Sequence, residues 1–332
     1  ESTGTKEDSM VVLTNGGSIS EKFNEPEKVE SNAGTLAACD IGTTTVVCYL
    51  IDKETGQIIA VRSGANPQRS FGADVLSRID AAARTDDNDK ANGGLQLMQS
   101  QIVSLLNGFI SDMLMECGRT EVCLFSVAGN TVMCHLLMGI SPEKLGRAPF
   151  MPDEYFGREF NPLDIGLENC QNGTILSGQE LPILFRSYVF EVEAEDAAQS
   201  TESSLAVHIA PGVYITQEDI RKLQLAKGAI AAGIEVLFKE YGCKPCDLDI
   251  LTFAGGFGNY IDKASAAAIG LFPPELLDRA KEVGNAAGNG AVSAALSQEA
   301  WESALDISGK MRYIELASYP RFDEIYVEHM NF

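Results

Sequence analysis

The chain has 332 residues, enough for two ordinary domains, and its 45% hydrophobic and 22% charged residues are typical of a globular protein. The formal net charge of −22 repels phosphate backbones and anionic membranes, so we expect neither nucleic acid nor a membrane as a partner. We expect a cytoplasmic protein, because the sequence has neither an apolar run of membrane-spanning length nor a signal pattern.

Residues 1–33 are polar and acidic and are predicted to form a flexible tail or linker. Three β-rich runs follow, separated by short turns at Gly42 and at 53–56, which predicts an antiparallel meander. The runs are LAACDIG, TTVVCYLID and QIIAVRS.

A helix is predicted from about Gly94 to Cys117, with Gly118 as its C-terminal stop. The run VCLFSVA (122–128) predicts a buried strand, and TVMCHLLMG begins another helix. Residues 150–212 are poorly periodic, and 191–204 look solvated.

Order returns at Ile215, where Thr216 is predicted to cap a long helix. The strand Leu248–Ala254 follows, then helices to about 309, a strand RYIELA and a short terminal helix. This alternation predicts an α/β protein with lobes at 34–180 and 215–332, joined by an irregular connection at 181–214.

The eight cysteines lie mostly in apolar contexts, which favours reduced core thiols over disulfides. Cys243-Lys-Pro-Cys246 is the one CxxC, and no second pair accompanies it. A plain loop is therefore favoured there, with a redox or metal role as the alternative.

The first candidate motif is Asp40-Ile-Gly-Thr-Thr-Thr45, between the first two predicted strands. Gly42 allows a tight turn with exposed amides, and the hydroxyls of Thr43, Thr44 and Thr45 add donors for phosphate oxygens. Asp40 has the oxygen ligands that a hydrated Mg²⁺ prefers. A β-hairpin with an acidic residue at the strand end explains the same pattern.

The second motif is Ala254-Gly-Gly-Phe-Gly-Asn259, at the end of a predicted strand. Its glycines would let a nucleoside or phosphate approach the backbone, and a tight strand–helix corner is the alternative. The spacing is not that of a dinucleotide-binding fingerprint. The third motif, Gly284-Asn-Ala-Ala-Gly-Asn-Gly290, favours close packing of the two lobes at a helix start.

Together, the Asp-Ile-Gly-Thr turn and the late Ala-Gly-Gly strand end resemble the superfamily of acetate kinase, sugar kinases, heat-shock chaperones and actin. Further blocks resemble the reductive activators of corrinoid proteins, in order from about residue 34 to 332. These blocks are Asn66-Pro-Gln68, Phe71 to Arg78, Gly129-Asn130 to His135, Ala148-Pro-Phe150, and Thr216 to Lys227.

The resemblance implies a two-lobed actin-like (ribonuclease H-like) ATPase that uses ATP and Mg²⁺ to help return a Co(II) corrinoid protein to Co(I). By carry-over, Asp40, Gly42, Thr43 and Thr44 would meet the phosphates and Mg²⁺. The residues implied for the nucleoside are Gly255, Gly256, Phe257 and Gly258, with Gln224 and Lys227 at the adenine or ribose. Asn130 would face the cleft, with a helix N-cap as its alternative. Asp74 and Arg78 are expected to form an ion pair.

The implied partners are a corrinoid protein or corrinoid-dependent methyltransferase system and an external electron donor, because no cysteine cluster for an iron–sulfur centre is evident. Homodimer formation is left open. Between Leu181 and Ile215 the sequence lacks the second phosphate loop of the superfamily, and Leu163-Asp-Ile-Gly166 is interpreted as a decoy. A small-molecule kinase and a non-catalytic binding module on the same fold are the alternative functions.

Overall fold

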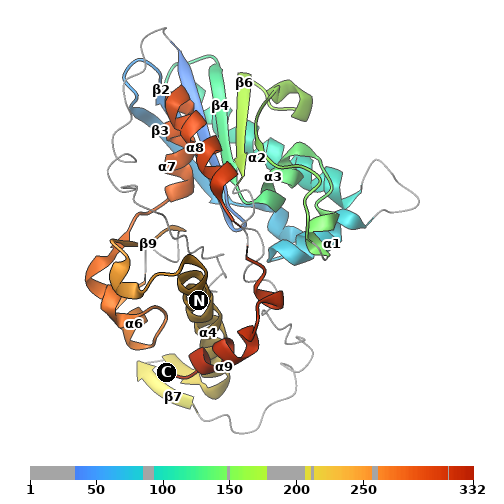
Figure 1. The fold of residues 1–332 in the computed structure, drawn as a ribbon. Helices are drawn as coiled ribbons and strands as arrows, with labels where there is room; N and C mark the ends of the chain where they lie inside the picture. The colour runs from blue at the N-terminus through green and yellow to red at the C-terminus, as the bar shows by residue number, and fades with distance from the viewer. Residues whose placement is uncertain are drawn as a thin grey trace. The chain divides into compact units, whose positions relative to one another are not determined.

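The computed structural model describes residues 34–84, 93–147, 150–177, 206–210, 213–255, 261–312 and 314–332. They divide into two units (Figure 1). The first contains the described residues from 34 to 177 together with 285–312, and the second contains 206–284 and 314–332. The predicted boundary placed 285–312 in the second lobe, whereas the structure groups this segment with the first unit.

A six-stranded sheet, ordered β3-β2-β1-β4-β6-β5, forms the centre of the first unit. Its strands are β1 (Thr35–Ile41), β2 (Thr45–Asp52), β3 (Ile58–Ala65), β4 (Val122–Gly129), β5 (Gly157–Phe160) and β6 (Cys170–Ser177). The first three form the predicted antiparallel meander, and β4 and β6 continue the sheet in parallel. Strands β5 and β6 were missed, because their stretch alternates weakly.

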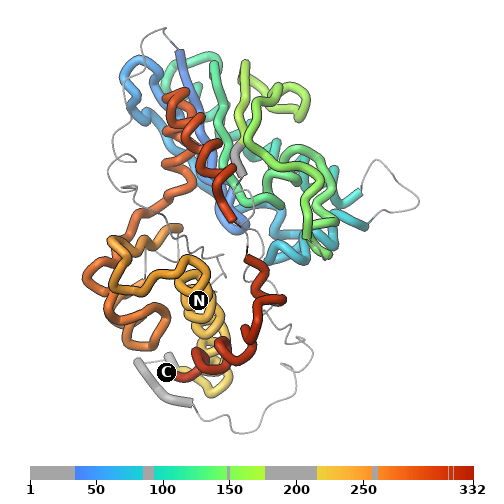
Figure 2. The backbone as a smooth tube through the Cα atoms, viewed as in Figure 1, coloured from blue at the N-terminus to red at the C-terminus, as the bar shows by residue number. Residues whose placement is uncertain are grey.

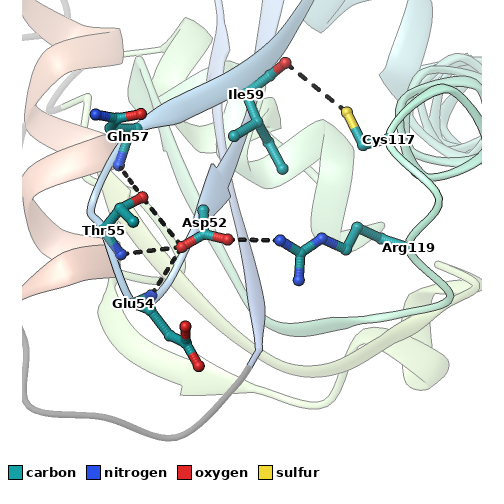
Figure 3. Close-up of polar contacts among 7 residues, drawn as sticks. All are labelled: Asp52, Glu54, Thr55, Gln57, Ile59, Cys117 and Arg119. Atoms are coloured by element: carbon teal, nitrogen blue, oxygen red, sulfur yellow. Dashed lines mark hydrogen bonds and ion pairs between the residues drawn. The ribbon is translucent and has the colours of Figure 1, made fainter.

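The predicted turn at 53–56 is held by Asp52 at the end of β2 (Figure 3). One carboxylate oxygen accepts from the backbone N–H groups of Glu54 and Thr55, at 3.1 and 2.9 Å. The other accepts from Arg119 at 2.5 Å. Hydrogen bonds to Thr55 and the charge of Arg119 lower the pKa of Asp52, so the turn is stabilised most when this carboxylate is ionised.

Helices cover the sheet of the first unit. They are α1 (Val75–Ala83), α2 (Gly94–Glu116), α3 (Thr131–Met138), α7 (Ala286–Leu296) and α8 (Gln298–Lys310). The prediction for α2 is confirmed, with Gly118 at φ 63° just beyond its end.

Helix α7 packs on β1 and β4, and Figures 1 and 2 both show α7 and α8 beside the sheet. Leu36 and Ala38 on β1 share a buried cluster with Ala291 and Ala295 on α7. Small side chains on both surfaces allow this close approach. Within the third glycine-rich motif, a Cβ on Gly288 would lie 2.8 Å from the hydroxyl of Tyr49 on β2, so this glycine serves packing within the first unit.

Leu163-Asp-Ile-Gly166 lies between β5 and β6 of the first unit, as its place in the order predicted. Asn161 caps a 3₁₀ turn over Pro162–Ile165, and Gly166 ends it at φ 82°.

The second unit centres on α4 (Gln217–Tyr241). Its other elements are β7 (Ala206–Ala210), β8 (Val213–Thr216), β9 (Leu251–Phe253), α6 (Lys263–Ala268), β10 (Ala280–Glu282) and α9 (Phe322–Met330). The predicted cap is confirmed: Thr216 Oγ1 accepts from the N–H of Asp219 at 3.1 Å, and the Asp219 carboxylate accepts from the N–H of Thr216 at 2.9 Å.

The prediction of a strand at RYIELA is wrong. Among its described residues, Arg312, Ile314 and Glu315 are not in a strand. The run ends in a 3₁₀ turn, Leu316–Ser318. Leu316 is buried with Ala232, Val236 and Phe322, so packing on α4 and α9 overrides the β-propensity of this run. None of the described helices combines the length and the hydropathy needed to cross a membrane.

Candidate functional site

The first candidate motif forms a two-residue hairpin turn between β1 and β2. The N–H of Gly42 donates to the carbonyl of Thr45 at 3.0 Å, with Thr43 and Thr44 between them. A Cβ on residue 42 would lie 2.6 Å from that carbonyl oxygen, so only glycine allows the turn to close.

Asn66 holds this turn from the side. Its side chain is fully buried, and its Nδ2 donates to the carbonyl of Gly42 at 2.8 Å. Its backbone N–H donates to the carbonyl of Thr44 at 2.7 Å, and its Oδ1 accepts from the N–H of Gln68 at 2.9 Å. One asparagine therefore fixes both the turn and the chain that follows β3.

Arg78 reaches the same turn from α1. Its buried guanidinium donates to the carbonyl of Thr43 at 2.6 Å and to that of Gly72 at 3.0 Å. The predicted ion pair with Asp74 is wrong, because the Asp74 carboxylate caps α1 by accepting from the N–H of Ser77 at 2.8 Å. Burial lowers the pKa of Arg78 to about 10.

Asn130 approaches the turn from the end of β4. Its Oδ1 accepts from the N–H of Met133 at 2.9 Å, which caps α3. Its Nδ2 donates to the hydroxyl of Thr43 at 3.1 Å. The helix N-cap is therefore confirmed, and the same side chain contacts Thr43 of the candidate phosphate turn. That Asn130 faces the cleft stays a prediction.

Asp40 lies near the end of β1, directly before the turn, and is half-buried. Burial and then the Asp40 charge raise the pKa of Cys134 on α3. Burial is also the main cause of the raised pKa of Tyr49, to which the Asp40 charge adds. Asp40 and the hydroxyl-bearing residues Thr43, half-buried Thr44 and exposed Thr45 follow one another closely along the chain. One carboxylate with hydroxyls is a donor set that fits Mg²⁺, which usually takes one or two protein carboxylates and completes its shell with water and phosphate.

In the second unit, Gly255 follows β9 at φ 79° and its N–H donates to the carbonyl of Gly284 at 2.8 Å. The predicted nucleoside contacts Gly256, Phe257 and Gly258 lie outside the described residues.

Gln224 and Lys227 lie one turn apart on α4, the first half-buried and the second buried. The Lys227 ammonium donates to the carbonyl of His329 at 2.6 Å and to that of Asn331, and lies 5.6 Å from the ring centre of Phe332. Burial lowers the pKa of Lys227. The ammonium thus caps the end of α9, and the adenine or ribose contact of both residues stays a prediction.

Of the predicted loop pair, Cys243 precedes the 3₁₀ turn Pro245–Asp247 and Cys246 lies within it, both with free thiols. Within the part of the chain that the structure describes, no three His, Cys, Asp or Glu side chains gather as metal ligands.

The roles of Asn66 and Arg78 were not predicted. Both are polar side chains with fully buried surfaces, within one short sequence block between β3 and α1. An Asn-Pro pair predicts a turn, and nothing in its local pattern indicates a contact with residues 24 to 35 positions earlier.

Two family models match the chain in succession. The model described as "RACo middle region" matches residues 36–185, and the one described as "C-terminal domain of RACo the ASKHA domain" matches residues 184–332. The predicted actin-like ATPase fold is thereby confirmed, since ASKHA names that fold.

A relative and a solved structure extend the comparison. The chain is 26% identical to the "Corrinoid activation enzyme RamQ" of Eubacterium limosum, covering 97% of this chain and 74% of the relative. That alignment spans 445 positions, more than the 332 residues here, so the relative carries segments without a counterpart. A solved "Reductive activator for corrinoid,iron-sulfur protein" superposes with a TM-score of 0.70 at 20% identity, covering 92% of this chain and 67% of that one.

Proposed function

The chain belongs to the RACo family, and from that premise we propose that it is an ATP-binding activator that promotes reduction of an inactive Co(II) corrinoid protein to Co(I). The similar proteins carry names for corrinoid activation, which supports this class of partner. The observation that carries the nucleotide part is the convergence of Asn66, Arg78 and Asn130 on the turn Gly42–Thr45.

The turn would bind the phosphates of ATP. Phosphoryl transfer depends on positioning and charge stabilisation, and a rigid turn with hydroxyls and exposed amides supplies both. Asp40 would hold Mg²⁺, which neutralises phosphate charge when bound. Asn130 orients the Thr43 hydroxyl beside it.

The reduction itself takes one electron from an external donor, which converts Co(II) to Co(I). Binding and hydrolysis of ATP would shift the activator between conformations that bind the corrinoid partner differently. Only such a difference in affinity can change the partner's state.

Calorimetric titration with Mg-ATP and Mg-ADP tests the nucleotide site. Gly42→Ala places a Cβ 2.6 Å from the Thr45 carbonyl oxygen and should weaken Mg-ATP binding by about tenfold or more. Gly108→Ala in α2 is the matched control, because its added Cβ meets no atom within 4 Å. Equal affinities of the two variants would refute the assignment of the turn.

A non-catalytic binding module is the second candidate, because the sequence between Leu181 and Ile215 contains no second Asp-x-Gly-Thr phosphate loop. Binding to a corrinoid protein that is the same with and without Mg-ATP would favour this module. Phosphorylation of a sugar or carboxylate by the purified chain would favour a small-molecule kinase instead.

A further inference from the structure

Arg78 is a buried cation whose charge is not neutralised by an ion pair. Its guanidinium is fully buried and donates to two carbonyls and, at 3.4 Å, approaches the sulfur of Met133. Among the described residues no carboxylate lies within ion-pair distance of it, although the charge of Asp74, which caps α1, still favours the guanidinium. Burying a charge without a close counter-charge costs free energy, so the hydrogen bonds to the two carbonyls must offset much of this cost.

Arg78 and Asn66 together hold two successive carbonyls of the turn. Asn66 binds that of Gly42 and Arg78 binds that of Thr43, at 2.8 and 2.6 Å. Asn66 and Arg78 also both contact the sulfur of Met133, at 3.6 and 3.4 Å. We call the hydrogen bonds of Asn66 and Arg78 to the two turn carbonyls the brace.

Because the peptide unit is planar, fixing these two carbonyls also fixes the direction of the N–H groups that follow them. In a trans peptide the carbonyl and the following N–H point to opposite sides. Tying back the carbonyls of Gly42 and Thr43 therefore directs the N–H groups of Thr43 and Thr44 away from Arg78 and Asn66. No described backbone acceptor takes either N–H. Two neighbouring free amides form an anion-binding concavity.

We propose that Arg78, with Asn66, is a positioning residue that aims the Thr43 and Thr44 amides at a phosphate group, and that its buried charge favours that anion from behind the turn. This inference rests on the proposed nucleotide site and assigns the block Asn66–Arg78 a role in it. At neutral pH the guanidinium stays charged, because even the lowered pKa of about 10 lies above that range.

Three variants separate the two parts of the proposal. Arg78→Met removes the donors and the charge, and Arg78→Lys keeps the charge but cannot span both carbonyls. Arg158→Met is the control, because Arg158 is an exposed arginine of the same unit that pairs with Glu154.

The first readout is amide hydrogen exchange of the nucleotide-free proteins over a fragment spanning Cys39 to Tyr49. We expect exchange at the turn to rise about tenfold or more in Arg78→Met and Arg78→Lys, and to stay unchanged in Arg158→Met. Unchanged exchange at the turn in a folded Arg78 variant would overturn the brace. Should Arg78→Met fail to fold, Arg78→Lys gives the same decision.

The second readout is the affinity ratio of Mg-ATP to adenosine, measured by calorimetry. Arg78→Met should lower this ratio about 10- to 100-fold, and Arg78→Lys, which keeps the charge, should lower it less. A merely structural loss would weaken the binding of both ligands alike and would leave the ratio unchanged. An unchanged ratio would overturn the role of the charge. If the wild-type protein binds no nucleotide while exchange still rises in the variants, the proposed function fails and the brace stands.

Discussion

The side-chain amide of Asn130 donates to the hydroxyl of Thr43 at 3.1 Å, while its carbonyl oxygen accepts from the N–H of Met133 at 2.9 Å. The residue that begins α3 is thus also a contact of the turn between β1 and β2. Helix capping and the candidate phosphate site therefore depend on one side chain, and substitutions can separate the two.

Asn130→Ser should keep the cap and lose the contact with Thr43, because serine is a good N-cap with a shorter side chain. We expect Mg-ATP binding to weaken by about 0.5–1.5 kcal/mol, the net value of one hydrogen bond, with the unfolding free energy nearly unchanged. Asn130→Ala should lose both and unfold about 1 kcal/mol more easily. Calorimetry and urea denaturation measure the two effects, and wild-type affinity in Asn130→Ser would contradict the assignment.

Gly288→Ala should destabilise the first unit. A Cβ at this position would lie 2.8 Å from the hydroxyl of Tyr49 and 2.7 Å from Nδ2 of Asn285, which caps α7. Overpacking of this kind costs about 1–3 kcal/mol. Gly290→Ala, in the same helix, meets no atom within 4 Å and should stabilise by up to about 1 kcal/mol, because alanine is the better helix former. Urea denaturation compares them, and equal effects would show that α7 does not pack as described.

Lys227→Met should loosen the end of α9. The substitution removes the buried ammonium that binds the carbonyls of His329 and Asn331, and a hydrogen bond to a charged group contributes about 1.5–3 kcal/mol. We expect a lower unfolding free energy and faster hydrogen exchange in α9. Lys222→Met is the control on the same helix, because Lys222 is exposed and pairs with Glu218. Loss of Mg-ATP affinity without loss of stability would instead indicate the predicted nucleotide contact.

The stability of the protein should fall as the pH drops below about 6.5, in part because of His135. The imidazole is fully buried, with Nδ1 2.7 Å from the carbonyl of Thr131 and its ring edge-on to Phe156. Burial lowers the pKa of His135, although the Thr131 carbonyl and the charges of Asp153 and Glu154 oppose this.

The pKa of His135 is lower in the folded protein than in the unfolded chain. As the pH falls below the pKa of the unfolded chain, the unfolded chain therefore binds more protons than the folded protein, and acidification favours unfolding. His135→Phe removes this titration and keeps a ring against Phe156. We expect its unfolding free energy to change less between pH 7.5 and 5.5 than that of the wild type. Parallel pH profiles would show that His135 contributes nothing.

Local patterns in the sequence determined several elements by themselves. The meander around Gly42, the helix that ends before Gly118 and the capping box at Thr216 each depend on residues a few positions apart, so short-range signals suffice. The α/β class followed from the order of such signals along the chain, and the actin-like fold was implied by the resemblance of the Asp-Ile-Gly-Thr turn and the late Ala-Gly-Gly strand end to a known superfamily.

Only the tertiary structure decided which distant residues meet. Arg78 binds the carbonyl of Thr43 instead of Asp74, and α7 packs on β1 across most of the sequence. RYIELA has β-propensity but packs its Leu316 between helices. The local sequence pattern indicates whether a side chain is buried. Which residue it contacts is set by how the whole chain fills the core. A buried polar group is stable only where the fold provides a hydrogen-bond partner for it.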